Sequence, residues 1–537
     1  MSPWWRDAVV YQVYPRSFAD ADGDGVGDLA GVRRRLAHVR ELGADAVWLT
    51  PWYPSDGADG GYDVADYRAI DPELGSLDDA EVLIAEASAH GLRTIIDVVP
   101  NHIATSHPWF RAAVASGPGS RERERFIFRP GLGADGAQPP NGWQSAFGGP
   151  AWTRVVEPDG RPGEWYLHLF TPQQADLNWR DDDVRSEFED VLRFWLSRGV
   201  AGIRIDSATM ISKDPALPPV PDLPGPGEHP YVDRDDVHEV YRSWRSVVDA
   251  QPGDERVLVG EVWLGDGERL AAYLRPGELH TAFNFDLMAQ PWDAAALRAP
   301  IIATLASHAG VGAPPTWVLS NHDVTRPVTR YGRADSGFDP GGRRAGVPTD
   351  LRLGTRRARA AALLVAALPG SLYVYQGDEL GLPEVEDLTP AQRRDPIFVQ
   401  TGGTDPGRDG CRVPLPWSGD TPPYGFSPDG GATWLPQPGD WAALTVEAQS
   451  ADPASMLTLY RDVLRLRREQ LRGRGEALRW LDVADGVLAF EREGGLCCAV
   501  NLSGDAVELP AGEVLLASEP LSGAALPPDA AAWWRAG

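Results

Sequence analysis

Eight short apolar or β-branched runs, separated by stretches of helical periodicity, constrain the fold of this chain more than any other feature. The runs lie at residues 9–14, 46–50, 94–99, 202–205, 257–260, 281–283, 316–319 and 371–375. After the first run, apolar side chains recur at helical spacing from Leu29 to Leu42. Alternating strands and helices are typical of a parallel α/β fold, and eight such strands close a barrel. We therefore predict a (β/α)8 TIM barrel.

Two interruptions and a change of pattern near the C-terminus indicate further domains. Residues 107–176 are rich in Gly, Pro, Trp and Phe and lack a helical period, which indicates a subdomain inserted after the third strand. A second Pro/Gly-rich insertion covers about 380–450. We predict that the barrel comprises 1–106 and 177–470, this insertion included. Short β-like runs with Gly turns predict a C-terminal antiparallel β domain over 471–537.

Acidic side chains follow three of the predicted strands. Asp206 comes after the fourth strand, Glu261 after the fifth and Asp323 after the seventh. Barrel closure would bring all three to the C-terminal face, where barrel enzymes hold their catalytic groups. Glycoside hydrolysis needs two carboxyls with separate roles. A single strand-end carboxylate could equally bind loop amides, but three in one barrel favour catalysis.

The neighbours of two of these acids suggest how their roles divide. Arg204 lies two residues before Asp206, on the same face of the strand. We expect its guanidinium to keep this carboxylate ionised, as a nucleophile needs. Glu261 stands among apolar and aromatic neighbours, including Trp263, and such surroundings suit a proton donor.

An acidic loop follows the first strand. Asp20, Asp22, Asp24 and Asp28 alternate with glycines, and carboxylates on a tight turn suit a hard cation such as Ca²⁺. Gly31 stands where an EF-hand carries its bidentate Glu, so the loop is not an EF-hand. From the residues alone, a metal site and an acidic solvated turn remain alternatives.

Composition argues against several classes of partner. The net charge of −27 would repel phosphate backbones and anionic lipids, so we expect neither nucleic-acid nor membrane binding. We expect no apolar run long enough to span a bilayer, and the N-terminus lacks a signal-peptide pattern. Cys411, Cys497 and Cys498 lack metal-site spacing. A cytoplasmic monomer or homodimer fits best.

Seven motifs in order carry a resemblance to a known family. The motifs span residues 25–29, 97–102, 174–179, 202–206, 260–263, 320–323 and 375–381. Together they resemble the α-amylase superfamily of glycoside hydrolases, family thirteen, and most closely its α-glucosidase and oligo-1,6-glucosidase branch. The resemblance covers essentially the whole chain.

The resemblance implies a role for each catalytic residue. Asp206 would be the nucleophile and Glu261 the general acid/base. Asp323 would bind sugar hydroxyls and favour the distorted sugar ring. Three further residues would line the first sugar subsite: His102, Arg204 and His322.

The resemblance also implies the rest of the pocket. Tyr62 and Asp63 would hold the terminal glucose, and Arg408 would join Asp63 at its 4-hydroxyl. Phe147 and Phe170 would form aromatic walls. The family's Arg-Asp-Asn-x-Arg-Thr-Pro motif reads Arg408-Asp409-Gly410-Cys411-Arg412-Val413-Pro414 here, a departure that affects the details of this loop.

The acidic loop matches the family's cation site. The resemblance implies that a structural Ca²⁺ or Mg²⁺ would be held by Asp20, Asp22, Asp24, Asp28 and the carbonyl of Val26. No organic cofactor is expected.

These observations predict a retaining, exo-acting α-glucosidase that acts on short oligosaccharides. Ser207 follows the nucleophile, where Val accompanies α-1,6 and Thr or Ala α-1,4 preference in the resembling branch, so we expect α-1,4 linkages to be preferred. The alternative is a transglycosylase or isomerase acting on sucrose, maltose or trehalose on the same scaffold. A catalytically inactive binding or transporter-ancillary subunit is disfavoured because all three acids are present.

Overall fold

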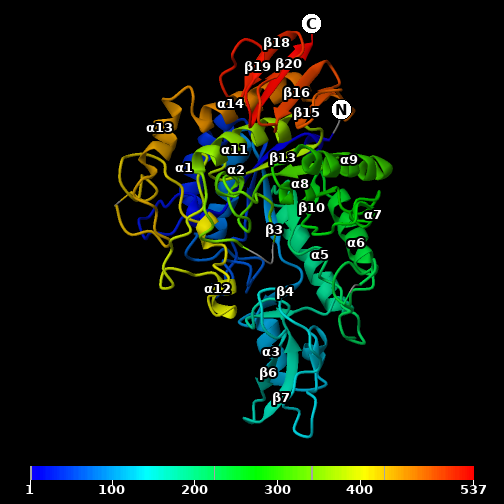
Figure 1. Cartoon of the computed structure of the whole chain (residues 1–537). Coiled ribbons are helices and arrows are strands. Elements are labelled where there is room, and N and C mark those ends of the chain that lie inside the picture. The colour runs from blue at the N-terminus through cyan, green and yellow to red at the C-terminus, as the bar shows by residue number, and fades with distance from the viewer. Residues whose placement is uncertain (1–2, 223, 340–342, 429, 537) are drawn as a thin grey trace.

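A parallel barrel forms the centre of the molecule. The computed structural model describes residues 3–222, 224–339, 343–428 and 430–536 (Figure 1). The eight barrel strands are β1 (Val9–Val13), β2 (Ala46–Leu49), β3 (Arg93–Val98), β9 (Gly202–Ile205), β10 (Val257–Gly260), β11 (Thr281–Ala282), β12 (Thr316–Val318) and β13 (Ser371–Tyr375). They pair in parallel in the order β11-β10-β9-β3-β2-β1-β13-β12, and a bridge between Asn284 and Trp317 joins the two ends. The predicted barrel is confirmed.

Helices surround the strands because each presents one apolar stripe toward them. They are α1 (Leu29–Leu42), α2 (Leu77–Ala89), α5 (Asp182–Leu196), α6 (Val237–Asp249), α7 (Gly267–Ala272), α8 (Asp286–Ala289), α9 (Ala294–Val311), α10 (Pro327–Tyr331), α11 (Leu351–Ala367) and α14 (Met456–Leu471). Short 3₁₀ turns η1 (Trp4–Arg6) and η2 (Pro15–Ser17) flank β1. Asp28 caps α1 through the amide of Gly31, and Gly43 ends it in the left-handed conformation.

A subdomain projects from one end of the barrel (Figure 1). It begins at β4 (His102–Ala104) and returns at β8 (Gln174–Asp176), which pairs antiparallel with β4. Between them lie α3 (Pro108–Ser116), α4 (Arg121–Glu124) and the sheet of β5 (Phe128–Arg129), β7 (Pro162–Leu167) and β6 (Trp152–Val156). The subdomain is thus attached beside His102, at the C-terminal end of the third barrel strand.

A five-stranded antiparallel sheet lies at the opposite end of the molecule (Figure 1). Its order is β14 (Leu478–Trp480), β15 (Val487–Arg492), β16 (Leu496–Asn501), β20 (Ala530–Ala536) and β18 (Gly512–Ala517), and β17 (Val507–Glu508) pairs with β19 (Ala525–Leu526). The insertion after β13 holds α12 (Pro396–Gln400), η3 (Asp409–Cys411), η4 (Trp441–Leu444) and α13 (Val446–Ser450). The C-terminal sheet packs on the barrel partly through Trp533, whose indole N–H donates to the Leu363 carbonyl of α11.

One helix in the described ranges is long and apolar enough to cross a bilayer. This helix is α9, with 18 residues and a mean hydropathy of 1.2. The expectation that no apolar run reaches this length is therefore wrong. Pro300 lies inside this continuous helix, and Leu297, Ile301, Thr304 and His308 are buried along it.

Candidate active site

The three predicted catalytic acids open into one cavity of about 620 Å³. Asp206, Glu261 and Asp323 all line it, each in the loop that follows a barrel strand. Parallel strands place these loops on one face, as the sequence predicted. The cavity therefore lies between the barrel and the projecting subdomain, which contributes Phe147 and Phe170 to its wall.

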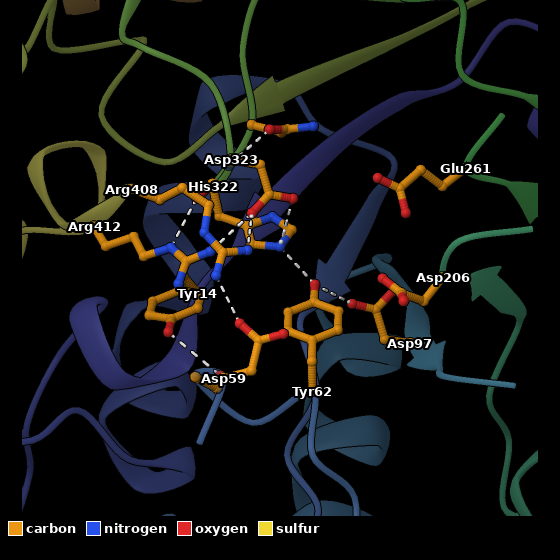
Figure 2. A network of polar contacts seen from close by, with 12 residues as sticks. Tyr14, Asp59, Tyr62, Asp97, Asp206, Glu261, His322, Asp323, Arg408 and Arg412 are labelled. Atoms are coloured by element: carbon orange, nitrogen blue, oxygen red, sulfur yellow. Dashed lines mark hydrogen bonds and ion pairs between the residues drawn. The ribbon is translucent and has the colours of Figure 1, made fainter. Parts of the chain in front are cut away.

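One buried arginine holds the catalytic end of the cavity together. Arg204 Nη1 lies 2.8 Å from Asp206 Oδ1, and its Nη2 lies 2.8 Å from Glu261 Oε2. The same guanidinium is 3.3 Å from Asp97 Oδ1. Asp97 also accepts hydrogen bonds from Trp48 Nε1 at 3.1 Å and the Tyr62 hydroxyl at 2.8 Å. We call Arg204, Asp97, Asp206 and Glu261 the catalytic cluster; Figure 2 shows its three acids.

The charges in the catalytic cluster do not balance. Burial raises the pKa of Asp206 well above its usual range, against the attraction of Arg204, and the charges of Glu261 and Asp97 raise it further. Burial likewise raises the pKa of Asp97 to about 7. The predicted contact between Arg204 and Asp206 is present, but Arg204 serves three carboxyls rather than one. One buried guanidinium therefore faces three buried carboxyls in the catalytic cluster.

Three donors orient Glu261. Besides Arg204, the backbone N–H of Ser207 donates to Oε2 at 2.9 Å and Trp263 Nε1 donates to Oε1 at 3.0 Å. The predicted apolar surroundings are thus only part of its environment. Ser207 lines the cavity and has a φ of 45°, the left-handed region that non-glycine residues seldom adopt. This backbone turn aims the Ser207 amide at Glu261.

A second cluster closes the opposite end of the cavity. Arg408 Nη1 lies 3.0 Å from Asp323 Oδ1, its Nη2 2.6 Å from Asp59 Oδ1, and its Nε 2.5 Å from Asp395 Oδ2. Arg412 Nη2 reaches the same Asp323 oxygen at 2.8 Å. We call these five residues the binding cluster; Figure 2 shows Asp59, Asp323, Arg408 and Arg412 across Tyr62 from Asp206 and Glu261.

Two of the three acids in the binding cluster, Asp323 and Asp395, have lowered pKa values. Burial would raise the pKa of Asp323, but the neighbouring His322 and then Arg408 and Arg412 lower it below its usual range. The pKa of Asp395 is lowered because the same two arginines outweigh its burial. Asp59 contacts only Arg408 of the two, and burial raises its pKa to about 6.

The structure corrects the predicted role of Asp63. Its carboxylate is fully buried and accepts from Ser55 Oγ and from the backbone amides of Asp56, Ala58 and Asp59. All these partners lie in its own loop, so Asp63 organises the loop instead of facing the cavity. Asp59 takes the place beside Arg408 that the sequence assigned to Asp63.

Aromatic and histidine side chains complete the glucose-sized part of the cavity. Tyr62, His102, Phe147 and Phe170 line it as predicted. The guanidinium of Arg408 lies 4.8 Å from the centre of the Phe147 ring. Arg204 and His322 are buried and are not among the lining residues, so they act on the site through their neighbours.

His322 supports the wall from behind. Its ring stacks on Tyr62 at 5.3 Å, and its Nε2 lies 2.6 Å from the Tyr62 hydroxyl and 3.3 Å from Asp323 Oδ2. Gln12 from β1 contacts the other ring nitrogen at 2.7 Å. His322 thus joins the binding cluster to the tyrosine that also contacts Asp97.

The only lysine of the chain ties the subdomain to the site. Lys213 Nζ lies 2.8 Å from Asp176 Oδ2 on β8 and donates to Asn101 Oδ1 at 2.5 Å. Asn101 Nδ2 in turn lies 3.1 Å from His102 Nδ1. Sequence reasoning assigned no role to Lys213, Asp97, Asp395 or Arg412; the rarity of lysine was the only signal that marked Lys213.

The acidic loop brings three carboxylates together. Atoms of Asp20, Asp22 and Asp28 lie within 4.8 Å of one another, which is compatible with a shared cation. Asp24 is not in this group and accepts the amide of Val26 instead. Asp20 and Asp28 also accept loop amides, so part of their capacity is already used.

Comparisons with known proteins agree on one family. The model of the α-amylase catalytic domain matches residues 12–473. The chain is 36% identical to trehalose-6-phosphate hydrolase of Escherichia coli (strain K12), over 87% of this chain and 84% of that protein. It is 33% identical to oligo-1,6-glucosidase of Parageobacillus thermoglucosidasius with the same coverage. The crystal structure of XgtA, described as an alpha-glucosyl transfer enzyme, superposes with a TM-score of 0.84 at 35% identity and covers 100% of both chains.

Proposed function

The chain belongs to the α-amylase family of glycoside hydrolases, and we propose that it is a retaining α-glucosidase that removes terminal glucose from short α-glucosides. Asp206 attacks C1 of the glucose while Glu261 protonates the departing oxygen, leaving a covalent glucosyl-enzyme. Glu261 then deprotonates a water that releases the sugar. Asp206 and Glu261 share Arg204, which supports the short carboxyl separation, about 5–5.5 Å, of retaining enzymes.

The observation that carries exo action is the closed end of the cavity. Arg408 bridges Asp59 and Asp323 across that end, so a glucose seated on Asp206 has its far hydroxyls against charged groups. A longer chain could not continue past this barrier. We expect maltose to be cleaved far faster than soluble starch, and an early drop in starch viscosity would contradict a closed pocket.

Linkage preference should depend on Ser207. We propose that α-1,4 bonds are preferred, because the small side chain of Ser207 lines the cavity beside Glu261 and leaves room for the acceptor sugar. A methyl-scale change in a pocket is worth about 1–3 kcal/mol, so the preference should be about tens-fold. The test compares kcat/KM for maltose and isomaltose in wild type and Ser207→Val. Ser207→Gly serves as a control that tolerates the left-handed φ.

A second candidate function is glucose transfer, which shares the covalent intermediate. The similarity to an α-glucosyl transfer enzyme favours testing it. If a sugar captures the intermediate faster than water does, concentrated maltose or sucrose should yield new oligosaccharides or isomers. Chromatography of these products separates the two functions.

We also propose that the acidic loop holds a structural Ca²⁺ or Mg²⁺. Asp20, Asp22 and Asp28 would supply carboxylate oxygens. Gly25 of this loop packs against Ala432, and none of the loop's acids lines the cavity, so we propose that such an ion stabilises the fold.

A further inference from the structure

A second cavity lies at the other end of the barrel, where the strands begin and the C-terminal sheet packs. Residues at the starts of β1 and β13, at the end of α14 and at the end of β15 line it, and its volume is about 70 Å³. One water needs about 10–15 Å³ of such space, so this cavity has room for a few waters or for one tetrahedral oxyanion. No described residue lines both this cavity and the active site.

The lining of the second cavity is basic, although the net charge of the whole chain is −27. Three acids, Asp7, Asp45 and Glu476, face six arginines, which are Arg6, Arg467, Arg468, Arg472, Arg474 and Arg492. The acids already have partners: Glu476 Oε1 lies 2.7 Å from Arg6 Nη2, and Asp45 Oδ1 lies 3.2 Å from Arg472 Nη1. Asp7 accepts the backbone N–H of Gly473 at 2.8 Å. Within the described ranges, the other four arginines form no ion pair with an acid.

Two of these four arginines are buried against the end of a helix. Arg467 and Arg492 are each only 4% exposed. Arg467 Nη1 donates to the Ala366 carbonyl at 2.6 Å, and Arg492 Nη1 donates to the Ala367 carbonyl at 2.6 Å. These carbonyls end α11, where the helix dipole supplies about half of one negative charge. The helix end therefore offsets only part of two whole positive charges.

The electrostatics of the two buried arginines show the same imbalance. Burial lowers the pKa of both Arg467 and Arg492 to about 10, and the positive charge of Arg467 lowers that of Arg492 further. Nearby acids act in the opposite direction but do not cancel this effect. Both guanidiniums are thus cationic at neutral pH. A buried charge without a counter-ion is unfavourable, and oxyanions match the planar donor fork of a guanidinium.

We propose that the second cavity binds one phosphate group, held between the barrel and the C-terminal sheet. Its oxygens would accept guanidinium N–H groups, and its charge would compensate Arg467 of α14 and Arg492 of β15. The inference is independent of the proposed α-glucosidase function, because the cavity lies at the opposite end of the barrel strands from Asp206. Since the ligand would contact both parts of the molecule, its binding should stabilise their packing.

Isothermal titration calorimetry of the full chain with sodium phosphate tests the proposal. We expect saturable binding of one phosphate per chain, and no saturable heat from sodium chloride at the same ionic strength, which separates a site from general screening. Titration with glycerol 3-phosphate shows whether the free anion or a phosphate monoester binds more tightly. Both titrations are repeated in saturating glucose, which fills the active site and should leave the heat of binding unchanged.

Two variants locate the bound phosphate. Arg492→Met removes one buried charged donor and should weaken phosphate binding about 10- to 150-fold. Arg474→Gln alters an exposed arginine of the same lining, so it tests the site without disturbing the core, and we expect a loss of about two- to fivefold. Arg352→Gln makes the same change at an exposed position of α11 outside the cavity and should bind like wild type.

Three outcomes would overturn the proposal. The first is the absence of saturable binding of either phosphate compound to wild type. The second is wild-type affinity in both Arg492→Met and Arg474→Gln. The third is loss of the heat of binding in saturating glucose, which would place the phosphate in the active site instead.

Discussion

The two ends of the cavity are built from the same residue types in different proportions. In the catalytic cluster one guanidinium, Arg204, serves three carboxyls. In the binding cluster Arg408 and Arg412 together serve three. The pKa of Asp206 is raised at the first end, whereas the pKa of Asp323 is lowered at the second. The two ends therefore differ in the ratio of cations to buried acids, and Asp206 and Asp323 differ in the direction of their pKa shifts.

This difference matches what each end must do. Cleavage needs a proton that can be handed to a leaving group and taken back. Binding needs side chains that keep the same charge when sugar hydroxyls replace the water molecules around them. Both clusters are buried, so burial alone cannot explain why the pKa of Asp206 rises and that of Asp323 falls. The neighbouring charges differ: His322, Arg408 and Arg412 lower the pKa of Asp323, whereas Glu261 and Asp97 raise that of Asp206 against Arg204.

The largest effect should come from the catalytic cluster. Asp206→Asn keeps the shape of the side chain but removes the nucleophile, so kcat should fall by about 10⁴-fold or more. Its thermal unfolding should stay close to that of wild type, because the neutral amide no longer adds to the excess of carboxylates around Arg204. A loss of less than about tenfold would show that the covalent step does not use Asp206.

The next largest effect should come from the binding cluster, and it also tests the corrected role of Asp63. Asp59→Asn removes a charged acceptor worth about 1.5–3 kcal/mol, so kcat/KM for maltose should fall about 10- to 150-fold. Asp63→Asn should mainly lower the melting temperature, because Asp63 accepts four hydrogen bonds within its own loop. A larger rise in the glucose inhibition constant for Asp63→Asn than for Asp59→Asn would contradict the correction.

The pH dependence of stability should have opposite signs for Asp97 of the catalytic cluster and Asp395 of the binding cluster. The pKa of Asp97 rises to about 7 on folding, so its contribution to stability is present at low pH and is lost as pH rises through 7. Asp97→Asn does not titrate and should gain about 2–4 kcal/mol relative to wild type between pH 4 and pH 8. Chemical unfolding at several pH values measures this gain.

Asp395→Asn is the matched control from the binding cluster. The pKa of Asp395 is lowered on folding, so its contribution is lost as pH falls below the unfolded value. The Asp395→Asn variant should therefore gain no stability relative to wild type as pH rises. If Asp395→Asn and Asp97→Asn both gained stability over this range, the proposed difference between Asp395 and Asp97 would be wrong.

The smallest expected effect concerns acids that have no arginine partner. None of the described ion pairs includes Asp20, Asp22 or Asp28, so a metal ion would have to supply the missing positive charge. Chelation should lower the melting temperature by a few degrees, since an ion that binds only the folded state stabilises it by mass action. Asp22→Asn should abolish the response, and an equal response in that variant would argue against the site.

Much of the architecture could be predicted from local sequence patterns. The spacing of apolar residues and the positions of turn residues predicted all eight barrel strands and the subdomain beside His102. The position of each acid just after β9, β10 or β12 predicted that all three would face one cavity. The location of the acids could be predicted because all strands of the barrel run parallel. Their C-terminal ends, and the residues that follow them, therefore lie on the same face of the barrel. Oligomeric state and cellular location stay predictions.

Only the tertiary structure decided which acids share which arginine. Asp59 and Asp63 stand four residues apart in a loop where Gly57, Gly60 and Gly61 all have positive φ, so sequence spacing does not reveal which carboxylate turns inward. The backbone amides of this loop capture Asp63, and Arg408, 349 residues away from Asp59, captures Asp59. Electrostatic pairing acts through space, and so the charge balance at each end of the cavity depends on side chains that the fold alone brings together.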